Sequence, residues 1–341
     1  MKRKNISAVL LTFSIVACVN QTEVALEDAE TIDICKLTED LSMIKRPQSF
    51  DILDDNHFVL TDWEQVYLYD FSGNQIQQIG TAGRAQFECN RPAHVRVHDG
   101  RIYVWSSGTL RFIEYTADGT PVAEYPYDSA VTDFRVSGDN IFIYTAGRRI
   151  KNVIDVYDKS SASVKTSLTP STKEHRFSLH NISSTPMYCD GESLAYASKD
   201  NMSLYLYDRN SGSAELFSDY KSESFEVEEV TDTNMLYTNW DKALKYYNEN
   251  PITIFVAPNE KGYYLLTAEG KFEMKDNNLT DGKRYIGLYD IRNSGSRRIA
   301  SYTYSSIGTQ DLYACWKNEI YFIRHKVEDD DIYTLEKLCI K

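Results

Sequence analysis

The sequence predicts an all-β protein built from six copies of one four-stranded antiparallel unit. An apolar strand that ends in Tyr-Asp, or in a close variant, recurs along the chain. A second apolar strand, opened by a tight-turn signal, precedes each of these strands, and another turn and short strand follow it in most units. Units of about 40 to 50 residues with four strands bury both faces when they are arranged radially. We therefore predict a six-bladed β-propeller.

The recurring strands set the spacing of the blades. The tyrosines of the first five Tyr-Asp strands are separated by 46, 42, 50 and 82 residues. The Tyr-Asp strands are 66–70, 111–116, 153–158, 203–208 and 285–290, with 332–337 as a degenerate sixth. The strands that precede them are 57–61, 101–105, 140–144, 193–197, 263–267 and 319–323. Only the interval of 82 residues needs a separate explanation.

Closure of the ring gives an independent check, because the last unit has only three strands of its own. The alternating segment 31–37 can supply the fourth strand by pairing with the C-terminal segment 334–340. Cys35 and Cys339 would then lie on adjacent strands, where a disulfide is feasible in an oxidising compartment. A placement of the two cysteines in mismatched pleats is the alternative. The other cysteines of the body are expected to be small buried side chains.

The long interval predicts an insertion at about 218–250, between blades 4 and 5. Asp232 and Thr233 are candidate N-caps and Pro251 is a stop signal, so one amphipathic helix is expected between them. Its apolar residues at helical spacing are Leu236, Trp240, Ala243, Leu244 and Tyr247. The insertion is either a lid packed on one face of the propeller or a ligand or partner surface that carries Trp240.

The first thirty residues predict export. Residues 1–17 combine a basic start with an apolar stretch that is too short to span a bilayer, which is typical of a signal peptide. The segment from Ile15 to Cys18 resembles the lipobox of bacterial lipoproteins, and this resemblance implies lipid attachment at Cys18. An ordinary cleavage site with an incidental cysteine is the alternative. Residues 18–30 are polar and acidic and predict a tether, followed by the propeller at 31–341.

Composition limits the classes of partner. The chain has 341 residues, 37 Lys plus Arg against 50 Asp plus Glu, a formal net charge of −13 and 42% hydrophobic residues. This apolar content excludes wholesale disorder, and the acidic balance argues against nucleic-acid binding. Removal of residues 1–17 would leave 34 basic and 50 acidic residues, so the mature chain is more acidic still.

One connection between blades carries a family resemblance. In the segment 79–97, Gly80, Gly83, Phe87 and Pro92 match a glycine-rich blade connection of NHL-type propellers. Ala85 and Gln86 stand where that pattern usually has Gly-Pro. Residues 31–341 as a whole resemble the six-bladed β-propeller lipoproteins of Bacteroidetes, within the NHL/TolB-like propeller superfamily. The resemblance implies an envelope lipoprotein, and this family is largely without an assigned reaction.

The mouth of the central channel is the expected place for a ligand. Several arginines fall on the inner strands or on the connections that lead into them, and they favour an anionic ligand such as a carboxylate or a uronic acid. Strand alternation that turns them to other faces, or into ion pairs, is the alternative. The candidate residues are Arg84, Arg91, His94, Arg96, Asp133, Arg135, His175 and Arg176, with Trp240 on the insertion.

No catalytic motif is recognisable in the sequence. The candidate ligands for a metal site on the inner strands are Asp51, Asp133 and Asp311. The acidic run 328–331 is a further candidate for Ca²⁺, although a solvated hairpin tip explains it as well. We therefore expect no evident cofactor, with Ca²⁺ as the one candidate. Ser129, in an Asp-Ser-Ala sequence, resembles the O-glycosylation site of Bacteroidetes.

Two functional hypotheses follow from these observations. The first is a non-enzymatic, membrane-anchored propeller of the bacterial envelope, at the outer membrane, that binds other envelope proteins or a small anionic or carbohydrate ligand. The second is a metal-assisted hydrolase or lyase that acts on an extracellular sugar or lactone. Neither the ligand nor the oligomeric state can be read from the sequence.

Overall fold

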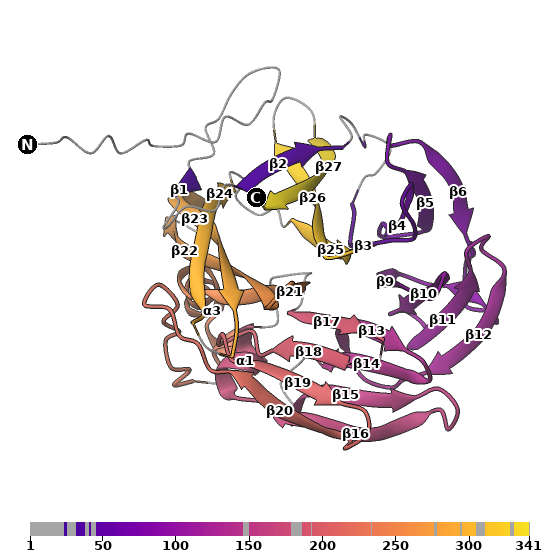
Figure 1. The fold of residues 1–341 in the computed structure, drawn as a ribbon, viewed down its shortest axis with the longest axis horizontal. Coiled ribbons are helices and arrows are strands. Elements are labelled where there is room, and N and C mark those ends of the chain that lie inside the picture. The colour runs from indigo at the N-terminus through magenta and orange to yellow at the C-terminus, as the bar shows by residue number, and fades with distance from the viewer. Residues whose placement is uncertain are drawn as a thin grey trace, which may run out of the picture.

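The computed structural model describes residues 24–25, 32–37, 41, 46–145, 150–178, 186–191, 193–232, 234–275, 278–293, 295–304, 311–327 and 331–340. In this part of the chain, the strands form six antiparallel sheets arranged as a ring (Figure 1). Each sheet has four strands, and that of blade 5 gains a fifth. The predicted six-bladed propeller is therefore confirmed.

The blades follow one another along the chain. Blade 1 is β3 (Ser49–Ile52), β4 (His57–Thr61), β5 (Val66–Asp70) and β6 (Gln75–Ile79). Blade 2 is β9 (Pro92–His98), β10 (Arg101–Ser106), β11 (Arg111–Thr116) and β12 (Pro121–Pro126), and the parallel pair β7 (Thr81–Ala82) and β8 (Glu88–Cys89) precedes it. Blade 3 is β13 (Val131–Ser137), β14 (Asn140–Thr145), β15 (Asn152–Asp158) and β16 (Ser163–Pro170). Blade 4 is β17 (Met187–Asp190), β18 (Ser193–Ala197), β19 (Leu204–Asp208) and β20 (Ser213–Ser218).

The last two blades carry the departures from the repeat. Blade 5 is β21 (Ile252–Asn259), β22 (Gly262–Lys275), β23 (Asn278–Ile291) and β24 (Arg297–Tyr304), and β1 (Val24–Ala25) pairs with β24. Blade 6 is β25 (Leu312–Trp316), β26 (Glu319–Val327) and β27 (Asp331–Ile340). Its fourth strand is β2 (Ile32–Lys36), which pairs antiparallel with β27. The N-terminal strand therefore closes the ring as predicted.

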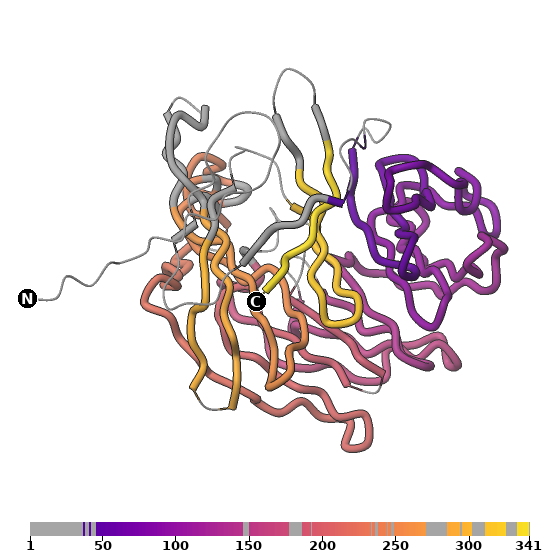
Figure 2. Tube along the Cα trace, turned by 45° about the horizontal axis from the view of Figure 1, so that its top comes forward, coloured from indigo at the N-terminus to yellow at the C-terminus, as the bar shows by residue number. Residues whose placement is uncertain are grey.

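Six hydrophobic clusters hold the ring together, one at each boundary between neighbouring blades. Strand side chains alternate between two faces, and both faces of a blade pack against a neighbour, so both faces are apolar. Figure 2 shows the yellow strands of blade 6 between the orange blade 5 and the indigo blade 1. The cluster between blades 6 and 1 joins Leu312 and Ile323 to Phe50 and Phe58. The ring is therefore sealed by packing as well as by pairing.

The Tyr-Asp repeat has a physical explanation. The five tyrosines of the repeat, Tyr69, Tyr115, Tyr157, Tyr207 and Tyr289, are at most 3% exposed and fill the boundaries between blades. The aspartate that follows closes the next turn: the carboxylates of Asp70, Asp158 and Asp208 accept hydrogen bonds from backbone N–H groups two to four residues later. One dipeptide therefore supplies a core residue and a turn cap.

The insertion between β20 and β21 contains two helices, α2 (Met235–Thr238) and α3 (Trp240–Glu249), where one was expected. Asn239 interrupts them, and its side chain accepts a hydrogen bond from the Lys242 N–H as the N-cap of α3. Trp240 therefore begins a helix and is 55% exposed, outside the small core of the insertion. Met235, Ala243 and Tyr246 are the described side chains of these helices that are buried.

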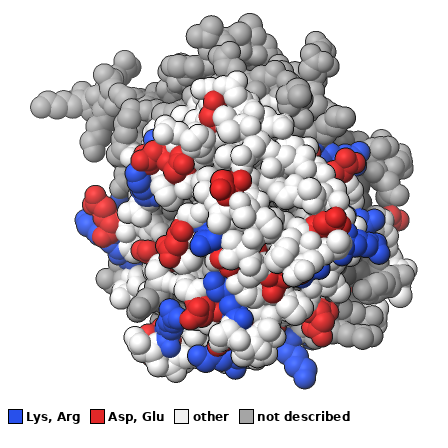
Figure 3. All heavy atoms as spheres, turned by 90° about the vertical axis from the view of Figure 1, so that its right-hand side faces the viewer, with Lys and Arg blue, Asp and Glu red and all other residues white. Residues whose placement is uncertain are grey.

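A third helix, α1 (Lys173–Ser178), links β16 to β17. No helix in the described part of the chain is long and apolar enough to cross a bilayer. On the side of the molecule outside β6 and β12, acidic and basic side chains are interspersed (Figure 3). The acidic balance of the chain is therefore not concentrated on that side.

Candidate functional site

Some of the residues predicted to line the channel mouth lie close together inside the ring. Arg96 on β9 spans three inner strands: its Nη1 donates to Ser49 Oγ (2.7 Å) and to the Phe50 carbonyl (3.1 Å) on β3. Its Nη2 lies 2.6 Å from Asp133 Oδ1 on β13. Arg135 pairs with the other oxygen of Asp133 at 3.2 Å. Arg96 is 4% exposed and Asp133 is fully buried, so this group ties blades 1, 2 and 3 together.

Burial shifts the pKa values of the groups around this ion-pair cluster. It raises the pKa of the Asp51 carboxyl to about 6, against an opposing effect of Arg96. It lowers the pKa of His94 to about 4 and that of Lys199, in the β18–β19 loop, to about 7, while Asp133 opposes both shifts. The His175 pKa falls to about 3, because the ring is buried and lies near Lys199. Both histidines are therefore neutral at pH 7.

The remaining candidates do not join this cluster. Arg84 and Arg91 are exposed on the connection between blades 1 and 2, and the Arg91 guanidinium lies 6.0 Å from the centre of the Trp63 ring. Arg176 on α1 donates through Nε to the Thr172 carbonyl. Trp240 projects from the start of α3. The structure thus brings His94, Arg96 and Arg135 together around Asp133, and an anion-binding role for any of them stays a prediction.

The three candidate metal ligands are engaged separately. The Asp51 carboxylate accepts hydrogen bonds from the backbone N–H groups of Ile52 (3.0 Å) and Val97 (2.9 Å). Asp311 is 6% exposed and lies 3.6 Å from Arg324. Among the described residues, no group of three or more His, Cys, Asp or Glu side chains could hold a metal ion. The acidic run 328–331 lies outside them except for Asp331, the first residue of β27.

The modification sites are only partly described. Cys18 and the segment 1–17 lie outside the described residues, so lipid attachment stays a prediction. Ser129 is exposed on the connection between blades 2 and 3. Cys339 is disulfide-bonded, whereas Cys89, Cys189 and Cys315 are free. The side chain of Cys35 is not among those described, so its pairing with Cys339 stays a prediction; the strand register places Cys35 opposite Lys337 and Asp33 opposite Cys339.

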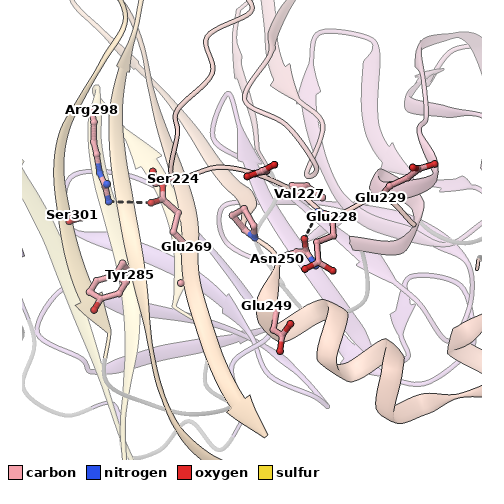
Figure 4. Close-up of a pocket in the computed structure, with 13 residues that line it drawn as sticks. Ser224, Val227, Glu228, Glu229, Glu249, Asn250, Glu269, Tyr285, Arg298 and Ser301 are labelled. Atoms are coloured by element: carbon pink, nitrogen blue, oxygen red, sulfur yellow. Dashed lines mark hydrogen bonds and ion pairs between the residues drawn. The ribbon is translucent and has the colours of Figure 1, made fainter. Parts of the chain in front are cut away.

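A pocket of about 820 Å³ lies where the insertion meets blade 5. One wall comes from β22, β23 and β24, and carries Glu269, Tyr285 and Arg298 (Figure 4). The segment 224–229 starts with Ser224 beside Glu269 on that wall and continues to Glu228 and Glu229 on the other side, where the end of α3 also lies. The described lining residues are Ser224, Glu226, Val227, Glu228, Glu229, Glu249, Asn250, Pro251, Glu269, Gly270, Tyr285, Arg298 and Ser301. We call this the blade-5 pocket.

Glu269 is the buried carboxylate of the blade-5 pocket, with 4% of its surface exposed. It accepts hydrogen bonds from the hydroxyls of Thr267 (2.5 Å) and Tyr289 (2.5 Å). Its second oxygen lies 3.2 Å from Arg298 Nη2. Such partners offset the cost of burying a polar side chain. The Arg298 guanidinium also lies 5.7 Å from the centre of the Tyr289 ring, so the repeat tyrosine of blade 5 helps to position it.

Hydrogen bonds to α3 hold the glutamate-rich segment of the pocket in place. The Glu228 N–H donates to Asn250 Oδ1 (2.6 Å), and the Glu228 carbonyl accepts from the Tyr246 hydroxyl (3.0 Å). Val227 and Val230 pack into the small core of the insertion. Sequence reasoning located the insertion but missed these glutamates. The alternation of Val227 and Val230 with acidic residues was the available signal.

Comparison with known proteins supports the fold. No family model matches the chain, and no curated protein matches it. Among solved structures, it is similar to a protein of Bacteroides fragilis NCTC 9343 that is named as an exported protein, with a TM-score of 0.61, 15% identity and coverage of 92% of this chain and 95% of that chain. It is also similar to a member of the DUF4221 family from Bacteroides vulgatus ATCC 8482, with a TM-score of 0.58, 12% identity and coverage of 94% and 99%.

Proposed function

We propose that this chain is an exported, lipid-anchored propeller of the bacterial envelope, at the outer membrane, that binds a ligand in the blade-5 pocket without transforming it. The signal-peptide pattern of residues 1–17 and the lipobox-like Ile15–Cys18 segment support export and anchoring. The Bacteroides fragilis protein of similar fold is named as an exported protein, which agrees with the proposed export of this chain.

The blade-5 pocket is the observation that carries the binding function. Its volume of about 820 Å³ falls in the range of small-molecule sites, and its walls combine an aromatic ring, amides and charged groups. The described lining residues include no His, Cys or Lys, and the buried carboxylate, Glu269, is already held by three partners. We therefore propose recognition of a ligand, and not a reaction, as the role of this pocket.

The connection between blades 1 and 2 supports a place in the NHL/TolB-like propeller superfamily. Gly80 has φ +68°, and a Cβ there would lie 2.7 Å from the Tyr115 hydroxyl. At Gly83, with φ +154°, a Cβ would lie 1.9 Å from a carboxylate oxygen of Glu88. Both glycines adopt positive φ values that other residues rarely adopt, and at Gly80 the Tyr115 side chain also leaves little room for a Cβ.

Lipid anchoring is tested in a bacterial host that processes lipoproteins, with radiolabelled palmitate. We expect label on the wild-type chain and none on Cys18→Ser, which should leave the membrane fraction. Cys89→Ser, which changes a buried free cysteine, is the control and should keep the label. Equal labelling of wild type and Cys18→Ser would refute an anchor at Cys18.

Ligand binding is tested by a thermal-shift screen of small amines, sugars and sugar acids against the full chain in detergent. A ligand of the blade-5 pocket should raise the melting temperature of the wild type, and Tyr285→Ala should reduce that shift by removing the aromatic wall. Trp63→Ala is the control, because Trp63 is an exposed aromatic residue of blade 1 (51% exposed) outside the pocket lining. If no compound gives a shift that depends on Tyr285, the pocket is not a ligand site.

A further inference from the structure

The blade-5 pocket has a strong excess of negative charge. Five glutamates line it, and Arg298 is the one cation among its described lining residues. Arg298 is already paired with Glu269. Glu249 lies 3.9 Å from Lys245, a mostly exposed and weak ion pair. The carboxylates of Glu226, Glu228 and Glu229 make no ion pair among the described residues, so they remain available to a ligand.

These three carboxylates project from a segment whose backbone is held before any ligand arrives. Asn250 is 1% exposed and accepts the hydrogen bond from the Glu228 N–H, while Tyr246 donates to the Glu228 carbonyl. Further along, the Val230 N–H donates to Glu174 on α1 (2.9 Å). The backbone positions of these exposed glutamates are therefore set without a ligand, which lowers the entropy cost of binding an oppositely charged one.

The carboxylates are spread around the pocket rather than focused on one point. Figure 4 shows Glu228, Glu229 and Glu249 directed along the insertion side, with Glu269 on the opposite wall. No described group of three such side chains is arranged to hold a metal ion. A dispersed set of carboxylates matches a ligand with several separated positive charges better than it matches a single divalent ion.

The wall opposite the insertion offers a second type of contact. The Tyr285 ring is 37% exposed and lines the pocket. An aromatic face attracts alkylammonium groups and also covers the methylene groups between them. An anionic ligand would meet the glutamates and would have to compete with Glu269 for Arg298. The cavity and its aromatic wall therefore agree with the charge in favouring an organic cation.

We infer that the blade-5 pocket binds a ligand with two or more amino groups along a flexible chain, either a polyamine or the lysine side chains of a basic peptide. The inference rests on the proposed binding function and assigns the chemical class of its ligand. It differs from the anionic ligand that the sequence predicts for the channel mouth, which is a separate place on the propeller.

The test is isothermal titration of the full chain in detergent with spermidine, with a tetralysine peptide and with a neutral and an acidic disaccharide. The triple variant Glu226→Gln/Glu228→Gln/Glu229→Gln should bind the cationic probes at least tenfold more weakly. The matched control is Glu64→Gln/Glu215→Gln/Glu260→Gln, which removes the same charge at exposed positions outside the pocket lining and should keep wild-type affinity.

Further measurements distinguish specific binding in the pocket from nonspecific electrostatic attraction of amines to the acidic surface. Affinity for spermidine should fall as salt rises from 50 to 300 mM, and Tyr285→Ala should weaken it about three- to tenfold. Calcium at the concentration of spermidine should compete poorly. Comparison of spermidine with tetralysine tells whether a small polyamine or a peptide is the better ligand. Melting temperatures close to wild type verify that the variants fold.

Three other outcomes would contradict the inference in part or in full. Equal losses in the two triple variants, or none in either, would show that amines only sample the acidic surface, and would overturn the inference. Tyr285-dependent binding of a sugar without binding of amines would overturn the cationic ligand and leave the proposed binding function standing. If no probe binds in a way that depends on Tyr285 or on the three glutamates, both the ligand class and the pocket as a binding site fail.

Discussion

Arg96 shows how a residue expected to bind a ligand takes part in the architecture. Its guanidinium contacts β3 through Ser49 and Phe50, and β13 through Asp133. Asp133 has no exposed surface, so its charge must be balanced inside the protein. A cation in this place stabilises three inner strands at once. Burial also lowers the pKa of Lys199, which interacts electrostatically with Asp133. The stability of this region should therefore depend on pH.

Replacement of Arg96 by Met should lower the free energy of unfolding by about 3 kcal/mol, because it leaves the buried Asp133 carboxylate with one arginine partner fewer. Urea denaturation measures this loss. Arg84→Met, at an exposed position, should change the value by no more than about 0.5 kcal/mol. Comparable stability of the two variants would mean that the Arg96–Asp133 pair contributes little to the ring.

Lys199 should make stability depend on pH. Its pKa is about 7 in the folded chain and about 10.5 when unfolded, so between these values the unfolded state binds more protons. Stability should therefore rise with pH across this window, by up to about 1.4 kcal/mol per pH unit from this group. Lys199→Met should remove that rise in urea titrations at pH 7, 8 and 9. Lys261→Met, on an exposed turn, should keep it.

At the scale of elements, the insertion is a small unit with its own core. Val230, Met235, Ala243 and Tyr246 pack together, and hydrogen bonds from α3 position the glutamate segment. The two helices are short, so their stability depends on this packing and on their caps rather than on length. The wall of the pocket therefore depends on how firmly α3 is formed.

Loss of the N-cap of α3 should loosen the insertion locally. Asn239→Ala removes the hydrogen bond from the Lys242 N–H and should cost about 1 kcal/mol. Hydrogen exchange of the α3 amides should accelerate about fivefold, while the blades exchange as before. Asn239→Asp retains a capping oxygen and should behave like the wild type. Unchanged exchange in Asn239→Ala would show that tertiary packing alone holds α3.

At the scale of the molecule, the ring depends on a strand from the other end of the chain. β2 pairs with β27 over five residue positions, from Ile32 opposite Ile340 to Lys36 opposite Glu336. Without it, blade 6 would have three strands and an open edge at β27. β1, by contrast, adds only two residues to the edge of blade 5.

A chain that begins at residue 38 should therefore be less stable than one that begins at residue 26. We expect a melting temperature lower by at least about 5 °C, together with oligomers formed through the open edge. Thermal unfolding and size-exclusion chromatography measure both effects. Of the described strands, the chain from residue 26 lacks only β1, and it should match the full-length protein in melting temperature. Identical behaviour of the two truncated chains would show that the closing strand is dispensable.

The blade architecture is readable from the sequence, because its period-two alternation and Tyr-Asp repeats reflect contacts made within each blade and at its boundaries. The sequence also located the closing strand and the insertion, through an incomplete last unit and one long interval. Its prediction of the helix was less complete: Asn239 divides the insertion into two helices, and Trp240 is exposed.

The directions of the charged side chains, by contrast, depend on how the blades pack together. Whether Arg96 faces solvent or Asp133 depends on the neighbouring blades, about forty residues away in sequence. The blade-5 pocket joins residues 224–229, 249–251 and 269–301, which no local pattern connects. The repeats can be recognised in the sequence because each unit makes the same local contacts. The pocket cannot be recognised in this way, because it forms where an irregular insertion packs against the ring.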